Sequence, residues 1–149
     1  MKKSVLALLA MFVVLSCGAG CSSGASGAGT KDAFAGNPNH VGVYYFHTSF
    51  RCPNCYNMEK WTQELVESDF KDEQASGKLA LKIINTETKG NEHFMNDYKL
   101  FTKSVVLGLV KDGKEVKFTN LAKVWDFLRS SDKFKAYVKD EISKYLKEL

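Results

Sequence analysis

The fold of this chain is decided by the stretch Val41-Gly-Val-Tyr-Tyr-Phe-His-Thr-Ser-Phe-Arg-Cys52-Pro-Asn-Cys55. Residues 41–47 carry no charge and are rich in Val, Tyr and Phe, which is typical of a central strand buried on both faces. A short link leads to a Cys-x-x-Cys pair, and residues with helical spacing follow it. A strand that enters a helix through a CxxC turn predicts a thiol–disulfide redox site.

The composition indicates one globular domain behind an atypical N-terminus. The chain has 149 residues, of which 44% are hydrophobic and 26% charged. About 110 residues remain after the N-terminal part, which is enough for one core, and we expect a monomer. The net charge of +4 is too small to indicate nucleic-acid binding. No Gly-rich nucleotide motif is present, and we expect no cofactor.

The N-terminus resembles a bacterial lipoprotein signal peptide. A positive start precedes an apolar run at residues 5–15, which is too short to span a bilayer. We expect cleavage just before a cysteine that then carries lipid. Cys17 is the preferred site because an apolar residue precedes it at the usual distance, and Cys21 is the alternative. An ordinary secretory signal with two incidental cysteines is a further alternative.

The leader divides the chain into three parts. We expect a signal peptide at 1–20, a flexible Gly- and Ser-rich tether at 21–39 and a domain at 40–149. The domain would lie outside the cytoplasmic membrane on a lipid anchor, or in the periplasm if it is not lipidated. This compartment permits disulfides, but a dithiol there needs a dedicated electron source. We therefore expect a protein thiol or disulfide partner, such as an upstream membrane electron donor.

The order of elements predicts the fold class. We expect strands at 41–47, 79–85, 104–110 and 115–118, and helices from Cys52 or Pro53 to about Phe70, from Asn91 or Glu92 to Leu100, over 121–128 with Asn120 as its cap, and after a cap at Ser131 or Asp132. Lys111-Asp-Gly-Lys is a hairpin signal between the last two strands. A parallel β-α-β start followed by a hairpin predicts an α/β fold with a mixed four-stranded sheet covered by helices.

This order, with CxxC at the start of the first helix, resembles the thioredoxin fold over about residues 41–146. The segments that carry a narrower resemblance are Tyr44-Tyr-Phe-His, Arg51-Cys-Pro-x-Cys55, Asn91-Glu-His-Phe94, Lys111-Asp-Gly-Lys-Glu-Val116 and Asn120-Leu. They are similar to the ArsF family, small thioredoxin-like proteins named as subunits of a nitrophenyl-compound nitroreductase. This resemblance implies a thioredoxin-like subunit. Any nitroreduction would belong to another subunit, because this chain lacks a nucleotide motif.

Three positions depart from the thioredoxin pattern. The dipeptide between the cysteines is Pro53-Asn54 instead of Gly-Pro, and Phe46 occupies the place of the buried acid. The proline that precedes the third strand, in cis conformation in thioredoxin, has no counterpart here. Ser104 stands near that place. The resemblance implies that it is the substrate-facing residue.

The two cysteines of the domain have different expected roles. Cys52 at the helix start is the predicted nucleophile, because the helix N-terminus and Arg51 both stabilise a thiolate. Cys55, one turn into the helix on its inner face, is the predicted resolving thiol. His47 at the strand end is a candidate proton carrier in place of the missing acid. The alternative for His47 is a structural histidine that is hydrogen-bonded to a loop.

Other functions remain open for the same residues. Cys52 and Cys55 are a candidate site for zinc, copper or arsenic(III), with His47 or His93 as further ligands. A structural zinc site usually has four protein ligands, whereas the domain has one close cysteine pair. A non-catalytic accessory subunit that uses only the surface of the fold is the other alternative.

Overall fold

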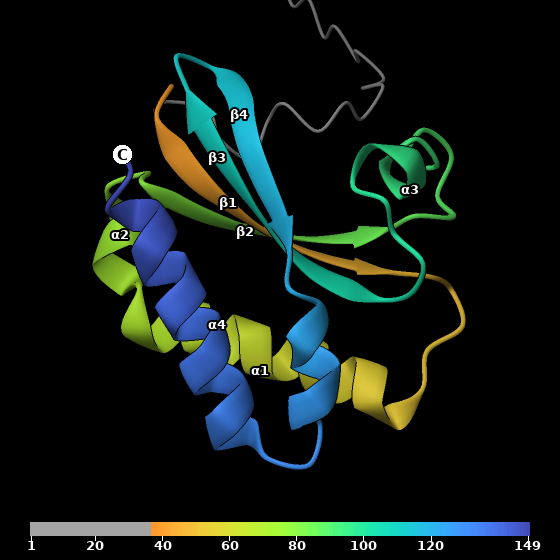
Figure 1. Cartoon of the computed structure of the whole chain (residues 1–149). Coiled ribbons are helices and arrows are strands. Elements are labelled where there is room, and N and C mark those ends of the chain that lie inside the picture. Colours follow the sequence, from red (N-terminus) through yellow and green to blue (C-terminus); the bar gives the residue numbers. More distant parts are fainter. Residues whose placement is uncertain (1–36) are drawn as a thin grey trace, which may run out of the picture.

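A four-stranded sheet with helices on both faces makes up the domain (Figure 1). The structure is a computed structural model that describes residues 37–149, so the predicted signal peptide, Cys17 and Cys21 lie outside the described residues. Its elements are β1 (His40–His47), α1 (Pro53–Asp69), α2 (Lys71–Ala75), β2 (Leu79–Asn85), α3 (Phe94–Asp97), β3 (Ser104–Lys111), β4 (Lys114–Asn120), the 3-10 helix η2 (Ala122–Phe127) and α4 (Ser131–Leu146).

The strand order is β2-β1-β3-β4, and the sheet is mixed. Strand β1 runs parallel to β2, with Val41 opposite Leu79, and antiparallel to β3, with Gly42 opposite Gly108. Strand β4 is antiparallel to β3, with a bulge between Leu109 and Val110. The predicted mixed four-stranded α/β fold is therefore confirmed, and the topology is thioredoxin-like.

Alternation along β1 supplies two cores, one on each face of the sheet. The larger core lies under α1 and α4, which cover the same face (Figure 1), and takes Val41, Val43 and Tyr45 from β1. The smaller core takes Tyr44 and Phe46 from the same strand and packs them against α3 and the loop after it. Because period-two alternation sends neighbours to opposite faces, an uncharged strand such as β1 is buried on both sides. Because α1 begins shortly after β1 ends, this buried strand places the start of the helix near the centre of the fold.

Four local details differ from the sequence expectations. Helix α2 was not expected, and α3 spans only Phe94–Asp97. Asn120 ends β4, where it pairs with Val106, so the expected cap is wrong and the next segment is the 3-10 helix η2. Helix α4 is capped by Ser130, whose hydroxyl accepts a hydrogen bond from the backbone N–H of Lys133 at 3.4 Å. Among residues 37–149, no helix has both the length and the apolar character needed to cross a bilayer.

Candidate redox site

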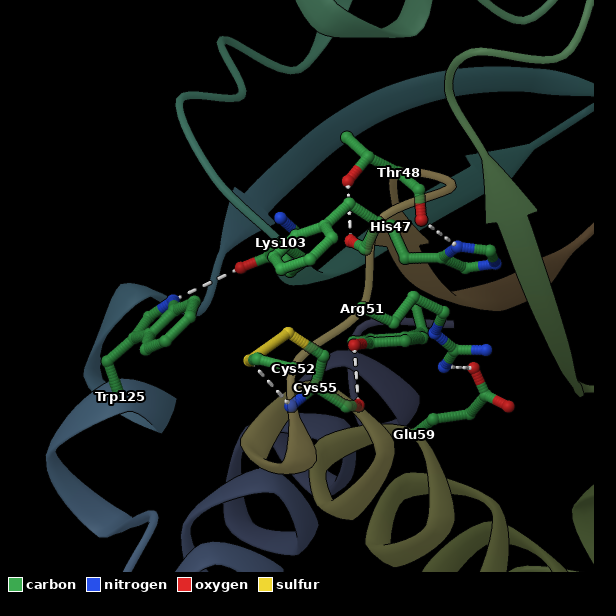
Figure 2. Close-up of a disulfide and its surroundings, with 10 residues drawn as sticks. His47, Thr48, Arg51, Cys52, Cys55, Glu59, Lys103 and Trp125 are labelled. Carbon is green, nitrogen blue, oxygen red and sulfur yellow. Dashed lines mark hydrogen bonds and ion pairs between the residues drawn. A yellow bond between two sulfur atoms is a disulfide. The ribbon is translucent and has the colours of Figure 1, made fainter.

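A disulfide joins Cys52 and Cys55 where β1 leads into α1 (Figure 2). Cys52 is the residue before the first helical turn, and its sulfur accepts a hydrogen bond from the backbone N–H of Cys55 at 3.3 Å. Pro53 takes the first helical position, where its missing N–H costs nothing. The Cα atoms of the two cysteines are 5.1 Å apart, so the bond forms within one helical turn.

The two sulfur-bearing residues differ in exposure. Cys52 is partly exposed, whereas Cys55 is only 1% exposed and lies on the buried side of α1. An external thiol or disulfide can therefore reach Cys52 and not Cys55. The first turn of α1 contains no acidic residue, so no carboxylate in that turn offsets the partial positive charge that the helix N-terminus presents to Cys52.

Tyr45 of β1 contacts the first turn of α1. Its side chain is fully buried, and its hydroxyl donates a hydrogen bond to the carbonyl oxygen of Cys55 at 2.7 Å. Burial raises the pKa of Tyr45 to about 12, although the positive charge of Arg51 opposes this shift. Tyr45 therefore stays protonated at neutral pH and acts as a donor that ties β1 to the first turn of α1.

Arg51 forms an ion pair with Glu59 of α1, and their side chains are 15% and 20% exposed. The guanidinium lies 4.4 Å from the ring centroid of Tyr56 and 6.0 Å from that of Tyr45. Burial lowers the pKa of Arg51, but the hydrogen bond and charge of Glu59 outweigh burial, so the pKa is raised overall. Figure 2 shows the guanidinium directed towards Glu59 and away from the sulfurs. The role of Arg51 as a thiolate stabiliser stays a prediction.

His47 ends β1 on the same side of the site as Arg51. Its ring stacks on Tyr45 at 6.0 Å between centroids, and its Nδ1 lies 2.9 Å from the carbonyl oxygen of Thr48. In Figure 2 the imidazole points away from the disulfide. This is the geometry of the structural alternative, and the proton-carrier role of His47 stays a prediction.

Ser104 begins β3, opposite Phe46 of β1. It is 4% exposed, and its hydroxyl donates to the carbonyl oxygen of Thr102 at 3.0 Å. Residues 37–149 contain no cis peptide bond. The structure thus places Ser104 at the inner end of the loop, with its hydroxyl already engaged, and its substrate-facing role stays a prediction.

Sequence patterns alone did not single out Tyr45, Glu59 or Trp125 as parts of the site. Trp125 of η2 is half-buried at the core edge, and its indole N–H donates to the carbonyl oxygen of Lys103 at 3.1 Å. Figure 2 places Trp125 across the disulfide from Arg51. A signal for Glu59 exists in hindsight, because it stands four residues after Cys55 and so follows it by about one helical turn.

A small hollow lies at the end of β1, against α3 and the loop that precedes β3. Its volume is about 130 Å³, and it is lined by Phe46, His47, Thr48, Thr86, Met95, Leu100, Phe101, Thr102 and Lys103. Phe101 at its rim is 94% exposed, and Phe50, two residues before Cys52, is 78% exposed. The Lys103 ammonium lies 5.8 Å from the ring centroid of Phe50. Exposed aromatic side chains such as Phe50 and Phe101 are suited to contact with a partner protein.

Among residues 37–149, no further side chains join Cys52 and Cys55 in a larger set of metal ligands. Within residues 37–149, no group of three or more His, Cys, Asp and Glu side chains is placed to hold an ion. His93, a suggested ligand, pairs through Nδ1 with the Asp97 carboxylate at 2.7 Å on the exposed surface of α3. A dithiol site for copper or arsenic(III) needs only Cys52 and Cys55, and that alternative stays a prediction.

Neither a protein-family model nor a curated protein sequence matches the chain. Among solved structures it is similar to thioredoxin from Fasciola hepatica, with 17% identity, a TM-score of 0.45, and coverage of 71% of this chain and 81% of that chain. It is also similar to reduced desulfothioredoxin from Desulfovibrio vulgaris Hildenborough, with 23% identity, a TM-score of 0.37, and coverage of 58% and 71%. The strand order and the CxxC disulfide at the start of α1 define a thioredoxin-like fold and indicate thiol–disulfide redox function.

Proposed function

We propose that this protein is a thiol–disulfide oxidoreductase that exchanges two electrons through Cys52 and Cys55. The observation that carries the proposal is the disulfide at the N-terminus of α1, with one partly exposed and one buried cysteine. A purely structural bond across so short a loop would add little stability. The asymmetry instead suits a reaction in which one sulfur meets the partner and the other completes the exchange.

The reaction consists of two exchange steps. The Cys52 thiolate attacks one sulfur of a partner disulfide, which forms a mixed disulfide and releases the other partner sulfur as a thiolate. Cys55 then loses its proton and attacks the Cys52 sulfur, which closes the intramolecular disulfide and releases the second partner thiolate. The partner gains two electrons, and the protons from Cys52 and Cys55 balance the two thiolates. The reverse sequence oxidises a partner dithiol, and the relative stability of the two redox forms sets the direction.

A membrane tether is part of the proposal. The charged start, the apolar run at residues 5–15 and the cysteines that follow support an exported lipoprotein. In that position, electrons would arrive from a membrane protein with a dithiol and leave to an extracytoplasmic disulfide. The narrower resemblance to the ArsF family supports a role as the accessory redox subunit of a larger enzyme.

Redox titration and partner trapping test the core of the proposal. The wild-type protein should titrate against a glutathione series with a finite reduction potential. Cys55→Ala should accumulate a mixed disulfide with its partner, because the resolving thiol is gone. The matched control is the double variant Cys52→Ala, Cys55→Ala, which should trap nothing. If Cys52→Ser leaves insulin reduction unchanged, or if the double variant captures partners as well as the wild type, the non-catalytic accessory role takes its place.

Lipid labelling tests the tether separately. Cells that express the full chain and are fed a labelled fatty acid should incorporate the label into the wild-type protein. Cys17→Ser should abolish incorporation if Cys17 is the anchor, whereas Cys21→Ser should leave it unchanged. The opposite pattern would assign the anchor to Cys21, and labelling of neither site would favour the ordinary secretory signal.

A further inference from the structure

Arg51, Tyr45 and Glu59 form a polar cluster beside the disulfide that the two exchange steps do not use. Arg51 precedes Cys52 directly in the chain, and Glu59 stands on α1 four residues after Cys55. The two charges pair with each other, and both side chains are mostly shielded from water. Tyr45 lies under the pair and donates its hydroxyl to the Cys55 carbonyl. The cluster thus connects β1, the link and α1 at the reacting sulfurs.

This cluster fixes the orientation of the Arg51 guanidinium. Figure 2 shows its guanidinium turned to Glu59 and away from the sulfurs. Arg51 Nε is buried and has no hydrogen-bond partner within residues 37–149, so the orientation is set by the Glu59 pair and by the rings of Tyr45 and Tyr56. Shielded charges are weakly screened by salt, and Arg51 directly precedes Cys52 in the chain.

Resting on the proposed function, we propose that Glu59 is a positioning residue that neutralises and holds Arg51, and thereby sets how oxidising the Cys52–Cys55 disulfide is. Only the reduced protein carries a negative sulfur, so a nearby free positive charge stabilises the reduced form selectively. A paired Arg51 offers Cys52 a dipole in place of a full charge. Glu59 therefore keeps the disulfide more stable, and less oxidising, than the helix N-terminus and an unpaired Arg51 would.

A double-mutant cycle tests this role with opposite expected signs. In Glu59→Gln, the Arg51 charge is uncompensated, so the Cys52 thiol should ionise at lower pH and the equilibrium with glutathione should move about threefold to tenfold towards the reduced form. In Arg51→Gln, the Glu59 charge remains alone, so the Cys52 thiol should ionise at higher pH and the equilibrium with glutathione should move towards the disulfide. The variant with both substitutions should return near the wild type. A tenfold change corresponds to about 30 mV.

The measurements are thiolate absorbance at 240 nm during a pH titration and redox titration against glutathione. Glu64→Gln is the matched control, because Glu64 lies on the same helix in an ion pair with Lys135 at 2.7 Å. It should leave both quantities unchanged. Raised salt should change the shifts of the two single variants only slightly, because both charges are mostly shielded from water.

Two results would overturn the inference: single variants that shift in the same direction, or a double variant that shifts further than either. Both outcomes are readable only if the wild-type disulfide titrates. A wild type without a finite potential would instead remove the proposed function. A variant that merely loosened the fold would not produce opposite signs, so a structural role of the ion pair is distinguished from a redox role.

Discussion

The hydroxyl of Tyr45 donates a hydrogen bond to the carbonyl oxygen of Cys55 at 2.7 Å. Tyr45 comes from the central strand β1, and Cys55 from the first turn of α1. Because the tyrosine is fully buried, no water can replace its hydroxyl without opening the core. This hydrogen bond fixes the position of the CxxC turn relative to the sheet.

Tyr45→Phe should lower the free energy of unfolding of the oxidised protein by about 1 kcal/mol, since a buried hydrogen bond is lost while the ring is kept. Urea unfolding followed by circular dichroism measures the change. Tyr137→Phe is the control, because Tyr137 is a half-buried tyrosine of α4 that packs on Phe127 away from the site. An equal loss of unfolding free energy in both variants would mean that the hydrogen bond to Cys55 contributes no more to stability than the Tyr137 hydroxyl does.

Alkylation of the reduced protein should distinguish its two cysteines. Cys52 should react with iodoacetamide at least about tenfold faster than Cys55. The helix N-terminus favours the Cys52 thiolate, whereas the Cys55 side chain is only 1% exposed. Mass spectrometry of peptides from a timed quench gives both rates. The unfolded reduced protein in urea is the control, and there the two rates should converge. Equal rates in the folded protein would remove the assigned division between attacking and resolving thiol.

Phe101→Ser should weaken the reaction with a protein disulfide and leave that with glutathione disulfide unchanged. Phe101 is 94% exposed and lines the hollow at the end of β1, so its replacement removes an exposed aromatic surface without disturbing the core. We expect kcat/KM for the protein partner to fall about tenfold. Val116→Ser is the control, because Val116 is exposed on β4. A parallel loss with both substrates would place the effect on the sulfur chemistry, against partner docking.

Glu115→Gln should stabilise the protein at pH 7 and have little effect at pH 4. Burial raises the pKa of Glu115 above its ordinary value of 4.5, although the hydrogen bond from Tyr98 opposes this. The folded state therefore binds this proton more tightly than the unfolded state, and its stabilising contribution, full below the ordinary pKa, is lost as pH rises through the raised value. Glutamine keeps an acceptor for the Tyr98 hydroxyl, which now donates at 2.7 Å.

The gain at pH 7 should stay below about 1 kcal/mol, because Glu115 is exposed on β4 and solvent screens its charge. Thermal unfolding at the two pH values measures it. Glu64→Gln gives the opposite sign, since the hydrogen bond from Lys135 holds the pKa of Glu64 below its ordinary value. If Glu115→Gln instead loses stability at pH 7, the ionised Glu115 carboxylate stabilises the fold and the expected gain is wrong.

Local pattern was sufficient for most of the fold. The uncharged run of β1, the helical spacing after Cys55 and the hairpin signal at Lys111–Lys114 each specify an element through nearest-neighbour chemistry, and the structure has all three. Helix ends were predicted less well. Asn120 is a good cap in isolation, but its ladder pairing with Val106 keeps it in β4. The competing partner is distant in sequence, so no local signal reveals it.

By itself, the sequence determined the strand–CxxC–helix arrangement and the order that makes the sheet mixed. These follow from hydrophobic period, turn residues and helix-start chemistry, all of which act over a few residues. Only the tertiary structure decided what surrounds the sulfurs: Tyr45 hydrogen-bonded to Cys55, Trp125 across the disulfide from Arg51, and Glu59 paired with the Arg51 charge. Those contacts depend on packing between β1, α1 and η2, and packing is a property of the whole fold.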